Sequence, residues 1–353
     1  MAGKQAKMIG EYQIKGRLGS GGMATVHLVE KDGKQFAAKM LHQHLMRDRW
    51  TVSRFKKEFE IGQKMKANPA FVKMLEYIKA DNCWTIIMEH VPGRTLQEMI
   101  TKLAPFTSKE ANAYIYELGD ALGSFHLNNY VHRDLKPDNI IITPKGKVKI
   151  MDYGVTRDLD VNITKTGTAV GTPLYMSPEQ ICGAKSTDCR CDLYSLGLIY
   201  YRLLSRRDAH GMSNNFEFMK LVDARMTKPI KAIKGFEEND TFAFISKSLS
   251  TQPDSRHSSS KDFCVELKSL QSFSNSRTAI IKKMHKLIET NNKKNNSKVK
   301  IEKTIEQKRP KSFLFKLVLA SAITAILATT VAFRLMGQEA FFNSLKSLFS
   351  QNS

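Results

Sequence analysis

The segment His132–Asn139, which reads His-Arg-Asp-Leu-Lys-Pro-Asp-Asn, constrains the fold of this chain more than any other feature. Asp134 can orient a hydroxyl nucleophile, and Asn139 can bind a hard divalent cation through its side-chain oxygen. Lys136 lies between them, where its charge would offset the charge that builds on a transferred phosphoryl group. A polar loop without function is the alternative. The chemical interpretation requires a fold that brings phosphate-binding and metal-binding groups to this loop.

Further motifs occur in the order typical of the eukaryotic-like protein kinases, and residues 132–139 resemble the catalytic loop of that family. A glycine-rich segment near the start resembles the loop that covers the ATP phosphates, because glycines let backbone N–H groups approach phosphate oxygens. Its residues are Leu18, Gly19, Ser20, Gly21, Gly22, Met23, Ala24, Thr25 and Val26. Ala24 stands where the family has a third glycine. Taken alone, this segment is equally consistent with a hairpin turn.

The run Phe36-Ala37-Ala38-Lys39 resembles the strand motif whose lysine holds the α- and β-phosphates. An exposed strand lysine is the alternative. The resemblance implies that Lys39 pairs with a glutamate on the following helix. Glu58 fits the family spacing better than Glu60, and two residues apart they face different sides of a helix, so only one can point at the site.

Asp152-Tyr153-Gly154 is similar to the Asp-Phe-Gly metal motif of the family. The resemblance implies that Asp152 and Asn139 hold Mg²⁺ between the phosphates of ATP, with Mn²⁺ as an alternative ion. Tyr153 replaces the family phenylalanine and adds a hydroxyl, which needs a hydrogen-bond partner when it is buried.

Three residues resemble structural rather than catalytic positions of the family: Glu179 in Ser-Pro-Glu, Asp192, and Arg256. Asp192 would brace the catalytic loop, and Arg256 would pair with Glu179. Ordinary surface ion pairs, which stabilise little, are the alternative.

Lys136 and Thr172 resemble features of the serine/threonine branch of the family. The run Met176-Ser177-Pro178-Glu179-Gln180, together with Gly21-Gly22-Met23, most resembles its bacterial members. Arg133 precedes Asp134, and the resemblance implies that it receives a phosphate from the activation segment. The candidate phosphorylation sites are Thr164, Thr166 and Thr168, of which we favour the last two. We therefore expect autophosphorylation in this segment, with a plain polar loop as the alternative.

The resemblance covers residues 12–270 and implies an α+β, bilobal kinase fold with a small β-rich N-lobe and a larger helical C-lobe. Alternating apolar and polar residues predict strands at 25–29 and 85–88, and helical periodicity dominates from Lys109. By resemblance, ATP would place its adenine between the lobes, with Met88 as gatekeeper and Glu89 to Val91 as the hinge.

Residues 277–311 hold twelve Lys or Arg against three Glu, a net charge of +9 out of +21 for the chain. A solvated, disordered linker is one interpretation. Attraction to anionic membrane lipids is a second, and both can hold together. We expect no nucleic-acid partner.

Residues 317–333 carry no charge, and the segment 313–333 is long enough to span a bilayer as one helix. A buried helix of the soluble domain is the alternative. Basic residues concentrate on its N-terminal side, which predicts a single-pass inner-membrane protein with a cytoplasmic kinase domain. The tail, 334–353, would then lie across the membrane.

Two further expectations concern association and compartment. Small residues at every fourth position of the span, Ala320, Thr324, Ala328 and Ala332, favour self-association as a homodimer. The first sixteen residues lack the apolar run of a signal peptide. The five cysteines have no metal-binding spacing, so we expect free thiols in a reducing compartment.

The motifs together predict a serine/threonine protein kinase that transfers the γ-phosphoryl of ATP to hydroxyls of protein substrates. A catalytically weak pseudokinase scaffold is the main alternative, although such a protein would normally lack Lys39, Asp134 or Asp152, and all three are present. A small-molecule phosphotransferase with a related fold is a second alternative.

Overall fold

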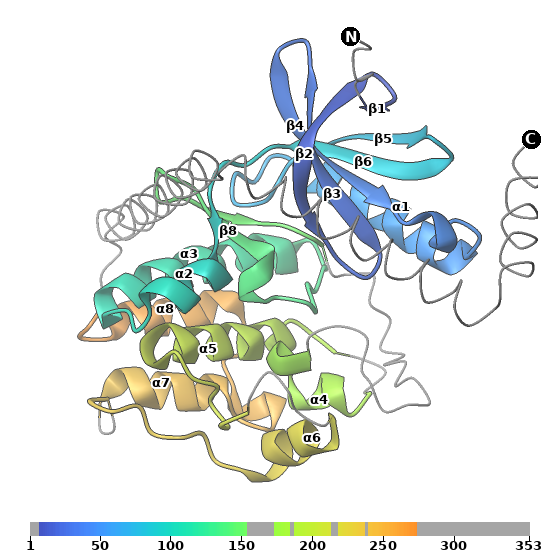
Figure 1. Ribbon diagram of the computed structural model, residues 1–353. Helices are drawn as coiled ribbons and strands as arrows, with labels where there is room; N and C mark the ends of the chain where they lie inside the picture. The colour runs from blue at the N-terminus through green and yellow to red at the C-terminus, as the bar shows by residue number, and fades with distance from the viewer. Residues whose placement is uncertain (1–6, 154–172, 184–186, 213–217, 237–238, 274–353) are drawn as a thin grey trace, which may run out of the picture. The chain divides into compact units, whose positions relative to one another are not determined.

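The structure is a computed structural model of the 353-residue chain. It describes residues 7–153, 173–183, 187–212, 218–236 and 239–273. The chain divides into two units, residues 1–288 and 289–353, and all of the second unit lies outside the described residues. The first unit consists of a β-sheet lobe followed in sequence by a helical lobe (Figure 1).

The N-terminal lobe is one antiparallel sheet with the strand order β1-β2-β3-β4-β6-β5. Its strands are β1 (Met8–Ile9), β2 (Tyr12–Ser20), β3 (Ala24–Lys31), β4 (Lys34–Leu41), β5 (Met74–Ala80) and β6 (Cys83–Glu89). Tight turns set the register. Asp32 and Gly33 join β3 to β4 with φ angles of 51° and 70°, the left-handed conformation that a two-residue hairpin turn requires.

Helix α1 (Arg49–Lys64) packs against the sheet. Asp48 caps its N-terminus by accepting a hydrogen bond from the Trp50 N–H, and Phe55, Glu58 and Ile61 are buried. Because these positions recur at helical spacing, one face of α1 is turned to the sheet. A glutamate on that buried face is unusual and requires a partner.

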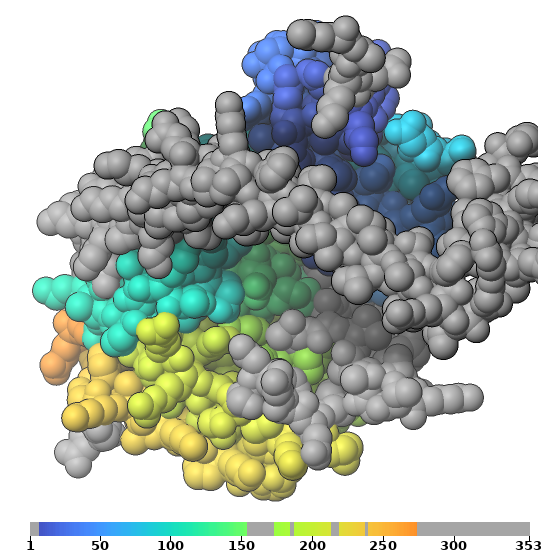
Figure 2. Space-filling view, in the orientation of Figure 1, coloured from blue at the N-terminus to red at the C-terminus, as the bar shows by residue number. Residues whose placement is uncertain are grey.

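The C-terminal lobe is built around α5 (Arg190–Ser205), whose residues from Cys191 to Tyr201 are all buried. A helix that is apolar around most of its circumference belongs at the centre of a helical packing. The helices around it are α2 (Leu96–Leu103), α3 (Ser108–Leu127), α4 (Pro178–Ile181), α6 (Phe218–Thr227), α7 (Asp240–Ser248) and α8 (Ser260–Ser269). In the space-filling view, the yellow residues of this lobe lie below the blue residues of the sheet (Figure 2).

A second, three-stranded sheet connects the lobes: β7 (Arg94–Thr95), β8 (Ile140–Ile142) and β9 (Val148–Ile150). The Val72 N–H donates to the Ile150 carbonyl at 3.0 Å, and the Ile150 N–H donates to the Ala70 carbonyl at 2.7 Å. The strand before Asp152 is therefore held by the N-terminal lobe.

Among the described residues, no helix is long and apolar enough to cross a membrane. The predicted span at 313–333, the basic segment at 277–311 and the tail at 334–353 lie outside them. All five cysteines are described, and each is a free thiol.

Candidate active site

Lys39 is the centre of a buried charge cluster. It lies on β4 between β3 and β6, opposite Val26 and Ile86, and only 8% of its surface is exposed. Its Nζ donates to Glu58 Oε1 on α1 at 2.7 Å and to Asp152 Oδ1 at 2.7 Å. Of the two glutamates considered from the sequence, Glu58 therefore contacts Lys39, whereas the exposed Glu60 lies 3.8 Å from Lys56.

The three charges perturb one another. Burial lowers the pKa of Lys39, but the Asp152 and Glu58 carboxylates outweigh burial, so the pKa lies above its ordinary value. Burial raises the pKa of Asp152, but the Lys39 ammonium outweighs it and lowers the pKa overall. The pKa of Glu58 is raised, because burial and the nearby Asp152 carboxylate oppose the attraction of Lys39. Lys39 and Asp152 are therefore both charged near neutral pH.

The catalytic-loop segment brings three predicted residues together. Asp134 Oδ2 accepts hydrogen bonds from Lys136 Nζ at 3.2 Å and from Asn139 Nδ2 at 3.3 Å. The Asn139 amide nitrogen also donates to the Asp134 backbone carbonyl at 3.0 Å. Pro137 begins the short 3₁₀ turn Pro137–Asn139, which returns Asn139 toward Asp134. A carboxylate held in this way keeps one orientation toward an incoming hydroxyl.

Asp192, at the start of α5, holds the backbone of this loop in place. Its carboxylate is fully buried and accepts from the backbone N–H groups of His132 and Arg133, both at 2.8 Å. It also contacts His126 Nε2 at 2.8 Å. Burial raises the pKa of Asp192, but these hydrogen bonds outweigh burial and keep the pKa below its ordinary value. They also hold Arg133 at a φ of 61°, which costs energy for a residue with a Cβ.

The donor set fits a hard divalent cation. The hydrogen bonds of the Asn139 side chain within the described structure use its amide nitrogen, which leaves the oxygen for a ligand. Asp152 remains ionised, and 44% of its side chain is exposed. In the described part of the chain, no three His, Cys, Asp or Glu residues form a metal-binding group. The Asn139 amide oxygen and the Asp152 carboxylate are oxygen ligands of the kind that hard divalent cations take.

The predicted nucleotide-binding segment, residues 18–26, forms the turn between β2 and β3, so it is also a hairpin. The Gly21 N–H donates to the Ala24 carbonyl at 2.9 Å. A Cβ added to Gly19, Gly21 or Gly22 would meet nothing within 4 Å, so the backbone there is open to a ligand. At the predicted hinge, the Glu89 side chain pairs with Lys149, whereas the Val91 N–H makes no hydrogen bond within the described residues. A nucleotide would therefore meet backbone rather than side chain at this point.

The buried hydroxyl group of Tyr153 has a hydrogen-bond partner. The hydroxyl donates to the Val72 carbonyl at 2.9 Å, and the ring stacks on Phe71 and Phe125 at 5.7 and 6.1 Å. Gly62 on α1 leaves room for this ring, since a Cβ there would lie 3.0 Å from it and would overlap Met74. Asp152 is thus placed by the packing of its neighbour.

Glu179 and Arg256 form the predicted pair, with two N–H···O bonds of 2.8 Å. Several contacts were missed from the sequence: His126 to Asp192, Gln180 Nε2 to the Arg133 carbonyl at 2.9 Å, and the buried Arg225. None carries a motif that could have identified it. The activation-segment candidates Thr164, Thr166 and Thr168, together with Thr172, lie outside the described residues.

The chain was compared with known proteins. The protein kinase domain family matches residues 12–285. The serine/threonine-protein kinase PrkC of Bacillus subtilis is 35% identical over 204 residues, which cover 57% of this chain and 31% of the relative. PknB of Mycobacterium tuberculosis is 36% identical over 203 residues, covering 55% of this chain and 32% of the relative. The serine/threonine-protein kinase pkn2 of Myxococcus xanthus is 34% identical over 207 residues, covering 56% and 25%.

The chain thus matches less than a third of the length of these relatives. The family match, by contrast, spans well over half of this chain and includes every described site residue discussed above. The chain belongs to the protein kinase domain family.

Proposed function

We propose that this protein is a serine/threonine protein kinase, which moves the γ-phosphoryl group of ATP to a serine or threonine hydroxyl of a protein. The observation that carries the proposal is the joint placement of Lys39, Glu58 and Asp152 in one ion cluster and of Asp134, Lys136 and Asn139 in one loop. The names of the relatives support the acceptor class.

Each group has a defined part in the transfer. Lys39, fixed by Glu58, binds the α- and β-phosphates. The proton of the acceptor hydroxyl passes to the Asp134 carboxylate while the acceptor oxygen bonds to the γ-phosphorus, and the bond to the β–γ bridging oxygen breaks. Lys136 offsets the charge that develops on the transferred group. A divalent cation held by Asn139 and Asp152 would supply charge neutralisation at the phosphate oxygens when bound.

The substitution Asp134→Asn tests this assignment. It removes the proton acceptor and keeps the shape, so transfer to myelin basic protein should fall by about 10²–10⁴-fold. ATP binding, followed by thermal shift, should be retained because Lys39, Glu58 and Asp152 are untouched. Asp138→Asn is the matched control: the same change in the same loop, at an exposed residue, should leave transfer near the wild-type rate.

Two outcomes would contradict the assignment. If Asp134→Asn transferred phosphate as fast as the wild type, Asp134 would not be the base. If the wild type bound ATP but transferred nothing, the pseudokinase scaffold would be the better description. Mass spectrometry on both proteins also tests autophosphorylation, which should place phosphate on Thr164, Thr166 or Thr168 in the wild type alone.

We further propose that the kinase is tethered to a membrane by residues 313–333 and faces the cytoplasm, with residues 277–311 attracted to anionic lipids. The uncharged run at 317–333 and the basic residues before it support this arrangement. The small-residue row through Ala328 supports self-association, which would favour phosphorylation between partners. The full chain should stay in the membrane pellet during alkaline carbonate extraction; its release would overturn the tether.

A further inference from the structure

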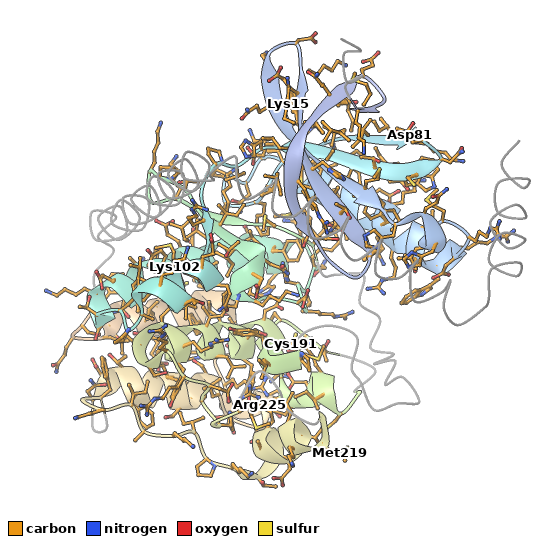
Figure 3. All side chains as sticks on the ribbon, viewed as in Figure 1. Lys15, Asp81, Lys102, Cys191, Met219 and Arg225 are labelled. Carbon is orange, nitrogen blue, oxygen red and sulfur yellow. The ribbon has the colours of Figure 1, made fainter. Side chains whose placement is uncertain are left out.

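Arg225 on α6 is a buried cation outside the nucleotide site. Only 1% of the residue is exposed, and Figure 3 shows it in the C-terminal lobe. One guanidinium nitrogen lies 3.2 Å from Asp208 Oδ2, and another contacts His210 Nδ1. The group also lies over the Tyr194 ring, 6.0 Å from its centroid. Burying an arginine costs several kcal/mol unless partners such as these compensate.

The protonation state of His210 fits this arrangement. Burial and the Arg225 charge lower the pKa of His210 to about 4. His210 is therefore neutral at physiological pH, and its unprotonated Nδ1 accepts a hydrogen bond from Arg225. Asp208 and His210 together satisfy part of the guanidinium group.

A further hydrogen bond of the Arg225 guanidinium group reaches a different segment. It donates to the Leu174 carbonyl at 2.7 Å, in the short 3₁₀ turn Pro173–Tyr175. The next carbonyl of the same turn, that of Tyr175, accepts from Ser195 Oγ on α5 at 2.7 Å. Two consecutive backbone groups of this turn are therefore anchored to the helices beneath it.

The turn lies beside the catalytic loop. It leads into α4, where Gln180 donates to the carbonyl of Arg133, the residue before Asp134. An acceptor hydroxyl that reaches Asp134 brings its flanking peptide residues over the neighbouring backbone. The turn Pro173–Tyr175 is such a neighbour, so its position affects how an acceptor peptide lies.

We propose that Arg225 is a positioning residue for the protein acceptor: by holding the Leu174 carbonyl, it fixes the turn Pro173–Tyr175 against which the acceptor peptide lies. The inference rests on the proposed kinase function and adds a residue of α6 to acceptor binding. A purely structural role would change stability and leave acceptor recognition unaltered.

The test compares KM values for myelin basic protein and for ATP. The double variant Asp208→Asn/Arg225→Met removes both charges, so neither is left buried alone. It should raise the KM for myelin basic protein about tenfold, equivalent to about 1.4 kcal/mol, within the range for a hydrogen bond from a charged donor. The KM for ATP should change by less than about twofold, because the double variant alters the binding of the protein acceptor and leaves the nucleotide-binding residues unchanged.

Two controls separate positioning from stability. Asp208→Asn alone keeps the bond from Arg225 to Leu174 and should keep the wild-type KM for myelin basic protein. Tyr200→Phe removes a buried hydroxyl that donates to Asn112 in the same lobe, away from the turn, and should destabilise the protein without raising that KM. Urea denaturation establishes the stability of each variant.

If the double variant does not fold, Arg225→Lys replaces it. The lysine keeps a charge opposite Asp208 but cannot form the forked contacts of the guanidinium group, so the same rise in acceptor KM is expected. An unchanged acceptor KM in either folded variant overturns the proposal, as does an equal rise in the KM for ATP or in the Tyr200→Phe control. A wild type that transfers no phosphate overturns the kinase function itself, and the acceptor role with it.

Discussion

At the residue scale, the ammonium group of Lys39 links parts of the chain that are 19 and 113 positions away. The two carboxylates stabilise Lys39 in its charged form, and Lys39 in turn lowers the pKa of Asp152, whereas burial keeps the pKa of Glu58 raised. Removing Lys39 would leave the buried Glu58 and the partly exposed Asp152 without the cation that lies between them. The cluster therefore links α1 to the segment after β9.

His210 gives a prediction about pH. Its pKa is about 4 in the folded protein against 6.5 ordinarily, so the unfolded chain binds a proton there that the folded protein does not bind. The stability from this site is complete above pH 6.5 and is lost as the pH falls toward 4. Protonation of His210 should therefore make the free energy of unfolding about 2 kcal/mol lower at pH 5 than at pH 7.

The substitution His210→Gln isolates that contribution, because glutamine still accepts a hydrogen bond from Arg225 and does not titrate. Urea denaturation at pH 7 and pH 5 should show a smaller loss for the variant than for the wild type. An identical loss in both proteins would mean that His210 is protonated in the folded state as readily as in the unfolded one.

The residues that could be predicted from the sequence are those whose chemistry lies in a short motif. Lys39, Asp134, Asn139 and Asp152 belong to this group. Arg225 does not, because its buried contacts come from residues 15 and 51 positions away and follow from how α6 packs. Burial of this kind depends on tertiary packing, which cannot be predicted from the pattern of a single sequence.

At the scale of elements, α1 is placed by the contact of Gly62 with Met74 and Tyr153. A Cβ at Gly62 would overlap Met74 Cγ and lie 3.0 Å from the Tyr153 ring. Gly62→Ala should therefore lower the unfolding free energy by about 1–3 kcal/mol, although alanine is the better helix former. In a Met74→Ala background that cost should shrink by about 1 kcal/mol, as expected for residues in contact.

Gly123 in α3 is the matched control. A Cβ there would meet only Ser260 Cβ, at an ordinary 3.6 Å. Gly123→Ala should therefore stabilise the protein by about 0.5–1 kcal/mol, the usual gain for a helix interior. If Gly62→Ala stabilised to the same degree, the close packing of α1 on Met74 would be contradicted. Both variants can be measured by urea denaturation.

The elements predicted from periodicity were the longer ones. The apolar alternation at 25–29 and 85–88 lies in β3 and β6, and the helical pattern after Lys109 lies in α3. The pairing of β7, β8 and β9 into one sheet was not predicted, because β7 and β8, of two and three residues, are too short to show a period. This sheet nevertheless holds the strand that precedes Asp152.

At the scale of the whole molecule, the two lobes contribute different chemistry to one site. Lys39 and Glu58 come from the sheet lobe, whereas Asp134, Asn139 and Asp152 follow strands and loops of the helical lobe. The ion pair between Lys39 and Asp152 joins them. In the proposed mechanism, phosphate binding and acceptor activation therefore both depend on how the lobes meet.

The most direct test of the kinase proposal is the transfer of label from [γ-³²P]ATP to myelin basic protein, followed by acid hydrolysis and separation of the phosphoamino acids. The wild type should yield phosphoserine or phosphothreonine, and Asp134→Asn should yield about 10²–10⁴-fold less. Equal label from both proteins, or label found on tyrosine alone, would contradict the account.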